Sequence, residues 1–196
     1  FREERGRLKL IVFLILGLGN PGSRYELTRH NAGFLALDNL ADKYKIKLAQ
    51  HKYNSLYGEG KINGLPVILA KPMTFMNESG KAVKALLSAF NLSPTEFLVI
   101  HDDIDLPLGK IKTKFKGGDG GQLGIRSTIE TLRTQEFCRV RIGVDRPEDR
   151  EDIVDHVLSS FTEEESSLLN DVINQAVHKI EAALKELNKR NNPTEE

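Results

Sequence analysis

The sequence predicts a three-layer α/β/α fold, a single domain in which helices cover both faces of a twisted mixed β-sheet. Two observations carry this prediction. Apolar runs of strand length are interleaved with longer segments of helical periodicity, and one pair of strands is joined by a two-residue turn. The turn requires an antiparallel pair, so the sheet is mixed. A chain of 196 residues is long enough for one sizeable core.

The domain is expected to span residues 8–190, after a disordered leader at 1–7 and before a frayed tail at 191–196. The apolar run from Leu8 to Leu18 includes Lys9 and is about half as long as a membrane span. It therefore predicts a buried strand instead of an anchor or signal peptide. We expect a soluble monomer without membrane contact, because nothing resembles an exposed self-pairing stripe.

The first half of the chain predicts two helices and three further strands. Helical spacing of apolar residues indicates a helix at 31–46, with Asn31 as a plausible N-cap. Two strands flank Asn63-Gly64, a dipeptide that tolerates the positive φ angles of a hairpin turn. An amphipathic helix follows at 79–91, and the turn at 93–96 leads into the buried strand FLVIHD.

The second half begins with an alternating strand at 110–116, followed by the glycine-rich loop KGGDGGQLG and a short helix at about 125–133. A strand at 137–144 buries Cys138, and a single cysteine excludes an internal disulfide, which favours a reducing cytoplasm. An acidic connector then precedes a long helix at 163–189, whose apolar stripe runs from Leu168 to Leu187.

The loop after the first strand carries three glycines at dinucleotide-binding spacing, Gly17, Gly19 and Gly22. A dinucleotide site is nevertheless disfavoured, because the next helix starts late, Pro21 has no N–H, and Asp38 falls inside a helix. No Gly-Lys-Ser/Thr follows, which excludes a P-loop. We interpret the loop as a ligand site, since open α/β sheets bind ligands beyond the carboxyl ends of their strands.

His30, in this loop, is the titratable group suited to proton transfer at neutral pH, although a surface or capping role is the plainer alternative. Asp102 ends a buried strand and would be able to hold the Nδ1–H of a histidine. A metal site at residues 101–105 is not expected, because neighbouring strand residues point to opposite faces. Asn77 has two open interpretations, an N-cap or an amide that holds a water or a carbonyl.

Formal net charge is zero, so a polyanion would have to meet a local patch. Lys110, Lys112, Lys114 and Lys116 alternate along one predicted strand and share one of its faces. With Arg126, Arg133, Arg139 and Arg141, residues 110–141 hold eight basic and three acidic side chains, while acidic residues concentrate at 145–165. We interpret this segment as a phosphate-binding face, the alternative being a solvated charge stripe.

Taken together, the motifs resemble those of bacterial-type peptidyl-tRNA hydrolases. The resemblance runs from Lys9 through nearly the whole chain, in the order LGLGNPGSRYELTRHNAG, KPMTFMNESGKAV, HDDIDLPLGKIKTKFKGGDGG and RVRIGV. It implies a cytoplasmic enzyme that hydrolyses the ester between peptide and tRNA, with peptidyl-tRNA as its partner and without a metal or cofactor.

The resemblance also implies roles. His30 would be the general base, Asp102 its stabiliser, and Asn20 and Asn77 the amides around the ester. The residues that would contact the substrate or the tRNA are Tyr25, Phe75, Met76, Asn77, Lys112, Lys114 and Arg141. Asn20 would contact the peptide part and favour a blocked amide over the charged amine of aminoacyl-tRNA, since a cation is costly to desolvate.

The chain departs from the family in its glycine-rich loop, which usually reads GGHNG and here reads GGQLG. Gln122 and Leu123 occupy positions expected to bind the acceptor end of tRNA, and a leucine side chain cannot form hydrogen bonds. We therefore predict intact chemistry with altered or weaker tRNA engagement. The alternatives are a hydrolase-like RNA-binding protein with weak or no catalysis, and a nucleotide-dependent oxidoreductase.

Overall fold

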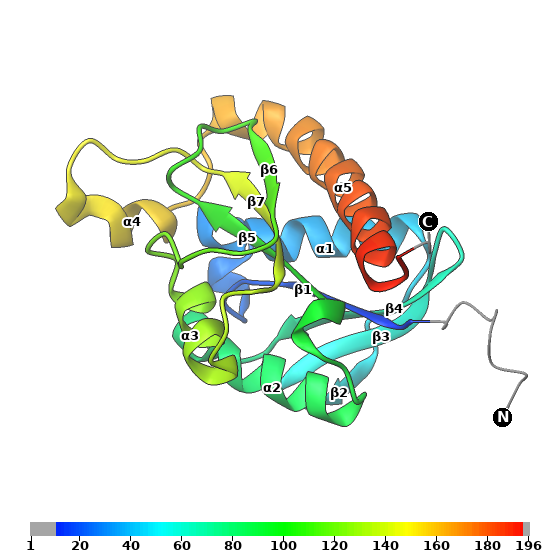
Figure 1. Cartoon of the computed structure of the whole chain (residues 1–196). Helices are drawn as coiled ribbons and strands as arrows, with labels where there is room; N and C mark the ends of the chain where they lie inside the picture. Colours follow the sequence, from blue (N-terminus) through cyan, green and yellow to red (C-terminus); the bar gives the residue numbers. More distant parts are fainter. Residues whose placement is uncertain (1–10, 194–196) are drawn as a thin grey trace, which may run out of the picture.

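The computed structural model describes residues 11–193, in which seven strands form one sheet in the order β2-β3-β4-β1-β5-β7-β6 (Figure 1). The strands are β1 (Phe13–Gly17), β2 (Gln50–Lys52), β3 (Ser55–Ile62), β4 (Leu65–Pro72), β5 (Phe97–Asp103), β6 (Ile111–Lys114) and β7 (Cys138–Gly143). The four central strands, β4, β1, β5 and β7, are parallel. Antiparallel strands flank them on both sides, so the predicted mixed sheet is confirmed.

Helices cover both faces of this sheet. The α-helices are α1 (Ala32–Lys43), α2 (Ser79–Ala89), α3 (Leu123–Leu132), α4 (Ile153–Val157) and α5 (Glu163–Asn191). Short 3-10 helices are η1 (Ser23–Tyr25), η2 (Arg29–Asn31), η3 (Met76–Glu78), η4 (Pro94–Glu96) and η5 (Arg150–Asp152). α1 and α5 lie on one face and α2 and α3 on the other, which confirms the three-layer α/β/α architecture.

The central strands are buried on both faces because alternate side chains enter different cores. In β1, Phe13 and Ile15 belong to the core under α1 and α5, whereas Leu14 and Leu16 belong to the core under α2 and α3. All five residues of β1 and all seven of β5 are buried. Both strands therefore end rigidly at the same edge of the sheet.

The hairpin predicted at Asn63-Gly64 is confirmed. Both residues have positive φ angles, 49° and 82°, and Ile62 pairs with Leu65 across the turn. β2 was not predicted, because QHK is polar and exposed and therefore shows no hydrophobic alternation. It pairs with the start of β3 at the edge of the sheet.

Several element boundaries differ from the prediction. Asn31 ends η2 and its side chain does not cap α1. The final helix continues to Asn191, whose side-chain amide donates to the carbonyl of Thr95 at 2.9 Å, and Leu168 is exposed instead of joining the apolar stripe. The expected leader at 1–7, the start of the apolar run at 8–10 and the tail residues 194–196 lie outside the described residues.

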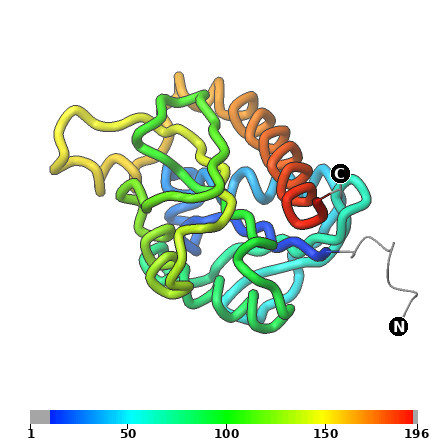
Figure 2. The backbone as a smooth tube through the Cα atoms, viewed as in Figure 1, coloured from blue at the N-terminus to red at the C-terminus, as the bar shows by residue number. Residues whose placement is uncertain are grey.

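The acidic connector contains η5 and α4, neither of which was predicted. In the backbone trace the connector extends away from the sheet, beyond the edge at which β5 and β7 end (Figure 2). None of the helices described for residues 11–193 is long and apolar enough to cross a membrane.

Candidate active site

A cavity of about 270 Å³ opens where β1 and β5 end. Five segments line it: Asn20 and His30 from the loop after β1, residues 75–77, residues 102–104 at and just after the end of β5, the glycine-rich loop at 119–123, and four residues in and next to α4, namely Ile153, Val154, Val157 and Leu158. This is the edge at which open α/β sheets bind ligands. The lining joins polar groups from the sheet end to apolar side chains from α4.

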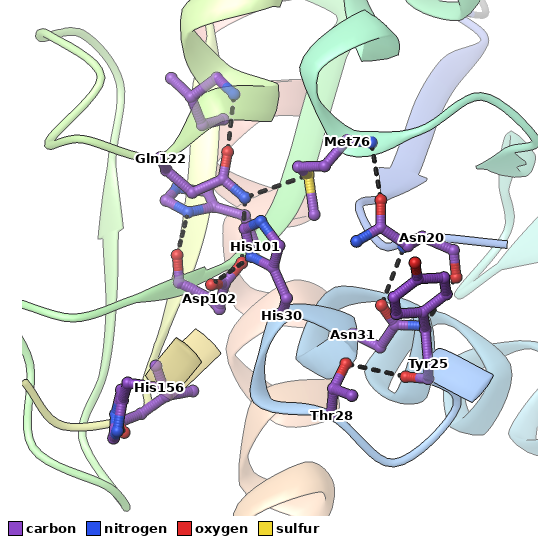
Figure 3. Close-up of polar contacts among 12 residues, drawn as sticks. Asn20, Tyr25, Thr28, His30, Asn31, Met76, His101, Asp102, Gln122 and His156 are labelled. Atoms are coloured by element: carbon purple, nitrogen blue, oxygen red, sulfur yellow. Dashed lines mark hydrogen bonds and ion pairs between the residues drawn. The ribbon is translucent and has the colours of Figure 1, made fainter. Parts of the chain in front are cut away.

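His30 and Asp102 form a buried pair in the wall of this cavity. Nδ1 of His30 lies 2.7 Å from Oδ2 of Asp102, and the two residues are 6% and 2% exposed (Figure 3). The start of α1 is pressed against the sheet to allow this contact. A Cβ atom at Gly33 would lie 2.4 Å from the carbonyl oxygen of Ile100, so a glycine is required there.

The interaction between His30 and Asp102 shifts the pKa of each residue in the direction that favours its charged form. Burial lowers the pKa of His30, but the negative charge of Asp102 and the hydrogen bond to it outweigh that effect, so the pKa is raised above 6.5. Burial likewise opposes ionisation of Asp102, yet the His30 charge and hydrogen bonds from His30 and Gln122 hold its pKa below the usual range. Asp102 is therefore an anion at neutral pH that stabilises a protonated His30.

Two further groups contact Asp102. Nε2 of Gln122 donates to its Oδ1 at 2.9 Å, and Nδ1 of His101 lies 2.7 Å from its backbone carbonyl. Burial lowers the pKa of His101, so this ring stays neutral and donates its Nδ1–H. Sequence reasoning treated His101 as background, and nothing in the strand pattern distinguishes its contact with a neighbouring carbonyl.

Asn20 reaches the cavity with half of its amide. Its Oδ1 accepts a hydrogen bond from the backbone N–H of Met76 at 2.8 Å, while its Nδ2 makes no hydrogen bond within residues 11–193. The backbone of Asn20 is held by Asn31, which explains why Asn31 does not cap α1. Figure 3 shows both asparagines on the same side of His30.

The other predicted substrate residues are only partly brought together. Phe75, Met76 and Asn77 line the cavity, with Phe75 and Asn77 exposed and Met76 buried. Asn77 lies within η3 and does not cap α2, so the N-cap interpretation is wrong. Tyr25 is not part of the lining. It lies beside Asn20 and Asn31 (Figure 3), with the guanidinium of Arg24 5.5 Å from its ring centre.

Hydrogen bonds from Arg29 connect η2, which contains His30, to the segment that follows α4. The buried guanidinium of Arg29 donates to the carbonyl of Ser160 at 2.7 Å, to the hydroxyl of Ser159 and to the carboxylate of Glu165. These three partners lie where α4 passes into α5. The sequence carried no indication of this contact, because the partners are about 130 positions apart.

The predicted phosphate-binding face is smaller than its charge count implied. Lys112 is exposed, Lys114 is half-buried, and Arg141 is paired with Asp103 at 3.2 Å beside the cavity. Arg139 is fully buried and donates to the carbonyls of Gly117, Gly118 and Gln135, so its inclusion in the face was wrong. Burial, together with repulsion from Arg141, lowers the pKa of Arg139 to about 10. Arg139 supports the glycine-rich loop from inside.

In the gly-rich loop itself, Gln122 is 7% exposed and Leu123 is 42% exposed, and both line the cavity. Gln122 was expected to contact tRNA, but both ends of its amide form hydrogen bonds within the protein.

Within residues 11–193, no group of three or more His, Cys, Asp or Glu side chains is arranged to hold a metal ion. Cys138 is buried, which raises the pKa of its thiol to about 12.

Comparison with known proteins gives consistent matches. The family model described as peptidyl-tRNA hydrolase matches residues 14–196. Curated peptidyl-tRNA hydrolases of Bacillus cytotoxicus and Bacillus subtilis (strain 168) are each 46% identical to the chain, over 86% and 88% of it and 90% and 92% of their own lengths. A crystal structure of peptidyl-tRNA hydrolase from Acinetobacter baumannii is 37% identical and superposes with a TM-score of 0.84, covering 93% of this chain and 95% of that one.

Proposed function

The chain belongs to the peptidyl-tRNA hydrolase family, and we propose that it cleaves the ester of peptidyl-tRNA with His30 as the general base. The observation that carries the proposal is the buried His30–Asp102 pair in the wall of the cavity. The enzyme would release free tRNA from prematurely released peptidyl-tRNA, and we propose that it acts as a monomer in the cytoplasm.

Proton transfer follows from the orientation of His30. Its Nδ1 is engaged by Asp102, which leaves Nε2 as the nitrogen that takes a proton from water. The water oxygen bonds to the ester carbonyl carbon, and the Asp102 carboxylate stabilises the imidazolium that forms. The bond to the ribose oxygen then breaks, and His30 returns the proton to that leaving oxygen. General base catalysis of this kind contributes ~10²–10⁴-fold.

Two amides would hold the reacting ester. Asn77 is exposed at the cavity and its side chain makes no hydrogen bond to the described part of the chain, which suits a donor to the developing oxyanion. The free Nδ2 of Asn20 suits the carbonyl of a blocked α-amino group. A charged amine at that position would offer only donors to another donor and would lose hydration.

The tRNA would lie against the basic residues beside the cavity. Asp103 lines the cavity and pairs with Arg141, and Lys112 stands opposite Arg141 in the β6–β7 pairing. Phosphate contacts by Lys112, Lys114 and Arg141 would place the acceptor end near His30. The alternative of an RNA-binding protein without catalysis is not favoured, because curated relatives of similar length are named hydrolases.

The test is release of the N-acetylated amino acid from N-acetyl-aminoacyl-tRNA. We expect His30→Ala to lower kcat/KM by ~10²–10⁴-fold. The matched control is His51→Ala at the exposed edge strand β2, which should retain wild-type activity. Equal activity in His30→Ala and wild type would overturn the general-base assignment. No activity in the wild type would favour the binding protein.

A further inference from the structure

We propose that Gln122 is a positioning residue, which orients the carboxylate of Asp102 so that its second oxygen faces His30. The inference rests on the proposed function, in which Asp102 stabilises protonated His30. It concerns a residue that sequence reasoning assigned to tRNA contact, at a position where this chain departs from the family's usual loop.

The geometry is a continuous row of three hydrogen bonds. The backbone N–H of Ile125 donates to Oε1 of Gln122 at 2.8 Å, and Nε2 of Gln122 donates to Oδ1 of Asp102 at 2.9 Å. Oδ2 of Asp102 accepts from Nδ1 of His30 at 2.7 Å. Figure 3 shows the side chains of Gln122 and His30 both pointing toward Asp102.

The direction of the Gln122 amide is set by α3. Gln122 is the N-cap of this helix, and its oxygen satisfies one of the N–H groups that have no partner within the helix. A flipped amide would point an NH₂ group at the Ile125 N–H and an oxygen at the Asp102 carboxylate, making two repulsive contacts. The start of α3 therefore leaves Nε2 of Gln122 facing Asp102. The second hydrogen of this nitrogen points toward the sulfur of Met76, and the nitrogen and the sulfur are 3.3 Å apart.

Asp102 depends on such a donor because it is 2% exposed. An ionised carboxylate oxygen without a partner in this setting carries a large desolvation cost. Without the bond from Gln122, the carboxylate of Asp102 would be held only through the one oxygen that contacts His30, and its plane would be free to rotate. The amide removes that freedom, and it does so at every pH, because an amide does not titrate in the physiological range.

The contact with Asp102 gives Gln122 a different expected role from its neighbour Leu123. Gln122 is 7% exposed and has no amide atom left for a ligand, whereas Leu123 is 42% exposed at the cavity mouth. A residue that acts through Asp102 should change kcat and leave KM nearly constant. A residue that contacts tRNA should do the opposite.

The principal variant is Gln122→Ser, since serine still caps a helix but is too short to reach Asp102. We expect kcat to fall about tenfold or more with KM changed less than about twofold. Gln122→Glu keeps the capping oxygen but sets a second carboxylate against Asp102, and kcat should fall further. Gln122→His, which restores a ring N–H donor, should recover most of the activity. The matched control is Gln50→Ser on exposed β2.

Melting curves of each variant verify folding before the kinetics are compared. Unchanged kcat in Gln122→Ser would overturn the proposal, as would a raised KM at constant kcat, which would return Gln122 to tRNA contact. His30→Ala, assayed in parallel, keeps the two hypotheses apart. If His30→Ala is inactive and Gln122→Ser is normal, only the positioning role fails. If His30→Ala is fully active, the proposed function fails as well.

Discussion

Asn31 binds the backbone N–H and the backbone carbonyl of Asn20 with the two ends of its side-chain amide. Its Oδ1 accepts from the backbone N–H of Asn20 at 2.8 Å, and its Nδ2 donates to the backbone carbonyl at 3.0 Å. Both residues are buried, Asn20 at 7% and Asn31 at 1% exposed. The turn after β1 is thereby attached to the start of α1, next to His30.

Replacing Asn31 by alanine should leave that N–H and carbonyl without partners. We expect a loss of about 1–3 kcal/mol in the free energy of unfolding, measured by urea denaturation, together with a raised KM. Asn39→Ala, which removes a single exposed bond to the carbonyl of Leu35, is the matched control. Equal stability of the two variants would contradict the argument.

The charge of Asp102 should set the pH at which the enzyme loses activity. Burial lowers the pKa of His30 and Asp102 raises it above 6.5, so the acid limb of wild-type kcat/KM should have an apparent pKa above 6.5. Asp102→Asn removes the charge but not the burial, so the limb should move below 6.5. The rate at neutral pH should also fall by ~10²–10⁴-fold. Asp171→Asn on exposed α5 is the control, and an unmoved limb in Asp102→Asn would refute the coupling.

Asn77→Ala tests the oxyanion donor. Its loss should lower kcat by ~10²–10³-fold with little change in KM, because the bond is made chiefly in the transition state. Stability should not change, since the Asn77 side chain is exposed. Asn174→Ala, at an exposed position of α5, should match the wild type. A rise in KM alone would indicate that Asn77 binds the ground state instead.

Leu123→Asn tests the departure in the glycine-rich loop. An asparagine at this 42% exposed position would add hydrogen-bonding groups at the cavity mouth, so we expect a lower KM for N-acetyl-aminoacyl-tRNA. The same exchange at Leu168, which is 55% exposed on α5, should leave KM unchanged. An unaltered KM in Leu123→Asn would show that the position does not limit tRNA engagement.

Lys112 and Arg139 should behave differently although they belong to one stretch of basic sequence. Lys112→Gln should weaken tRNA binding and reduce the slope of log affinity against log salt by about 1, as expected for one phosphate contact. Arg139→Gln should destabilise the protein, because three carbonyls lose their donor. Fluorescence titrations with tRNA at several salt concentrations measure the slope for Lys112→Gln, with Lys185→Gln as the control. A normal slope in Lys112→Gln would exclude the contact.

The fold was predictable from the sequence because its main elements are defined locally. The apolar run around β1, the helical spacing of α1 and the Asn63-Gly64 turn each identify an element without knowledge of the rest. α4 was missed because it has only five residues and lies within an acidic connector. β2 was missed because it is short and polar and exists only through its pairing with β3.

The candidate site was predictable in its residues but not in its supporting contacts. His30 and Asp102 belong to motifs that can be recognised in the chain, and the fold brings them within 2.7 Å. The charge pattern assigned Arg139 to the phosphate-binding face, and the motif assigned Gln122 to contact with tRNA. The structure buries both side chains: Arg139 lies under the glycine-rich loop, and Gln122 caps α3 and contacts Asp102. Neither contact is visible in the sequence, because it depends on where the loop folds.

Chemical labelling of Cys138 can report local opening of the folded protein. This residue is the only cysteine, it is 1% exposed in β7 of the central sheet, and burial raises the pKa of its thiol to about 12. Its side chain lies in the core under α5 and borders a cavity lined by Leu187 and Arg190 of that helix. Thiol reagents attack the thiolate, so labelling in the native protein must wait until the end of α5 moves off the sheet. The labelling rate therefore measures how often this helix opens, and a bound ligand that slows the labelling reveals its affinity without any assay of catalysis.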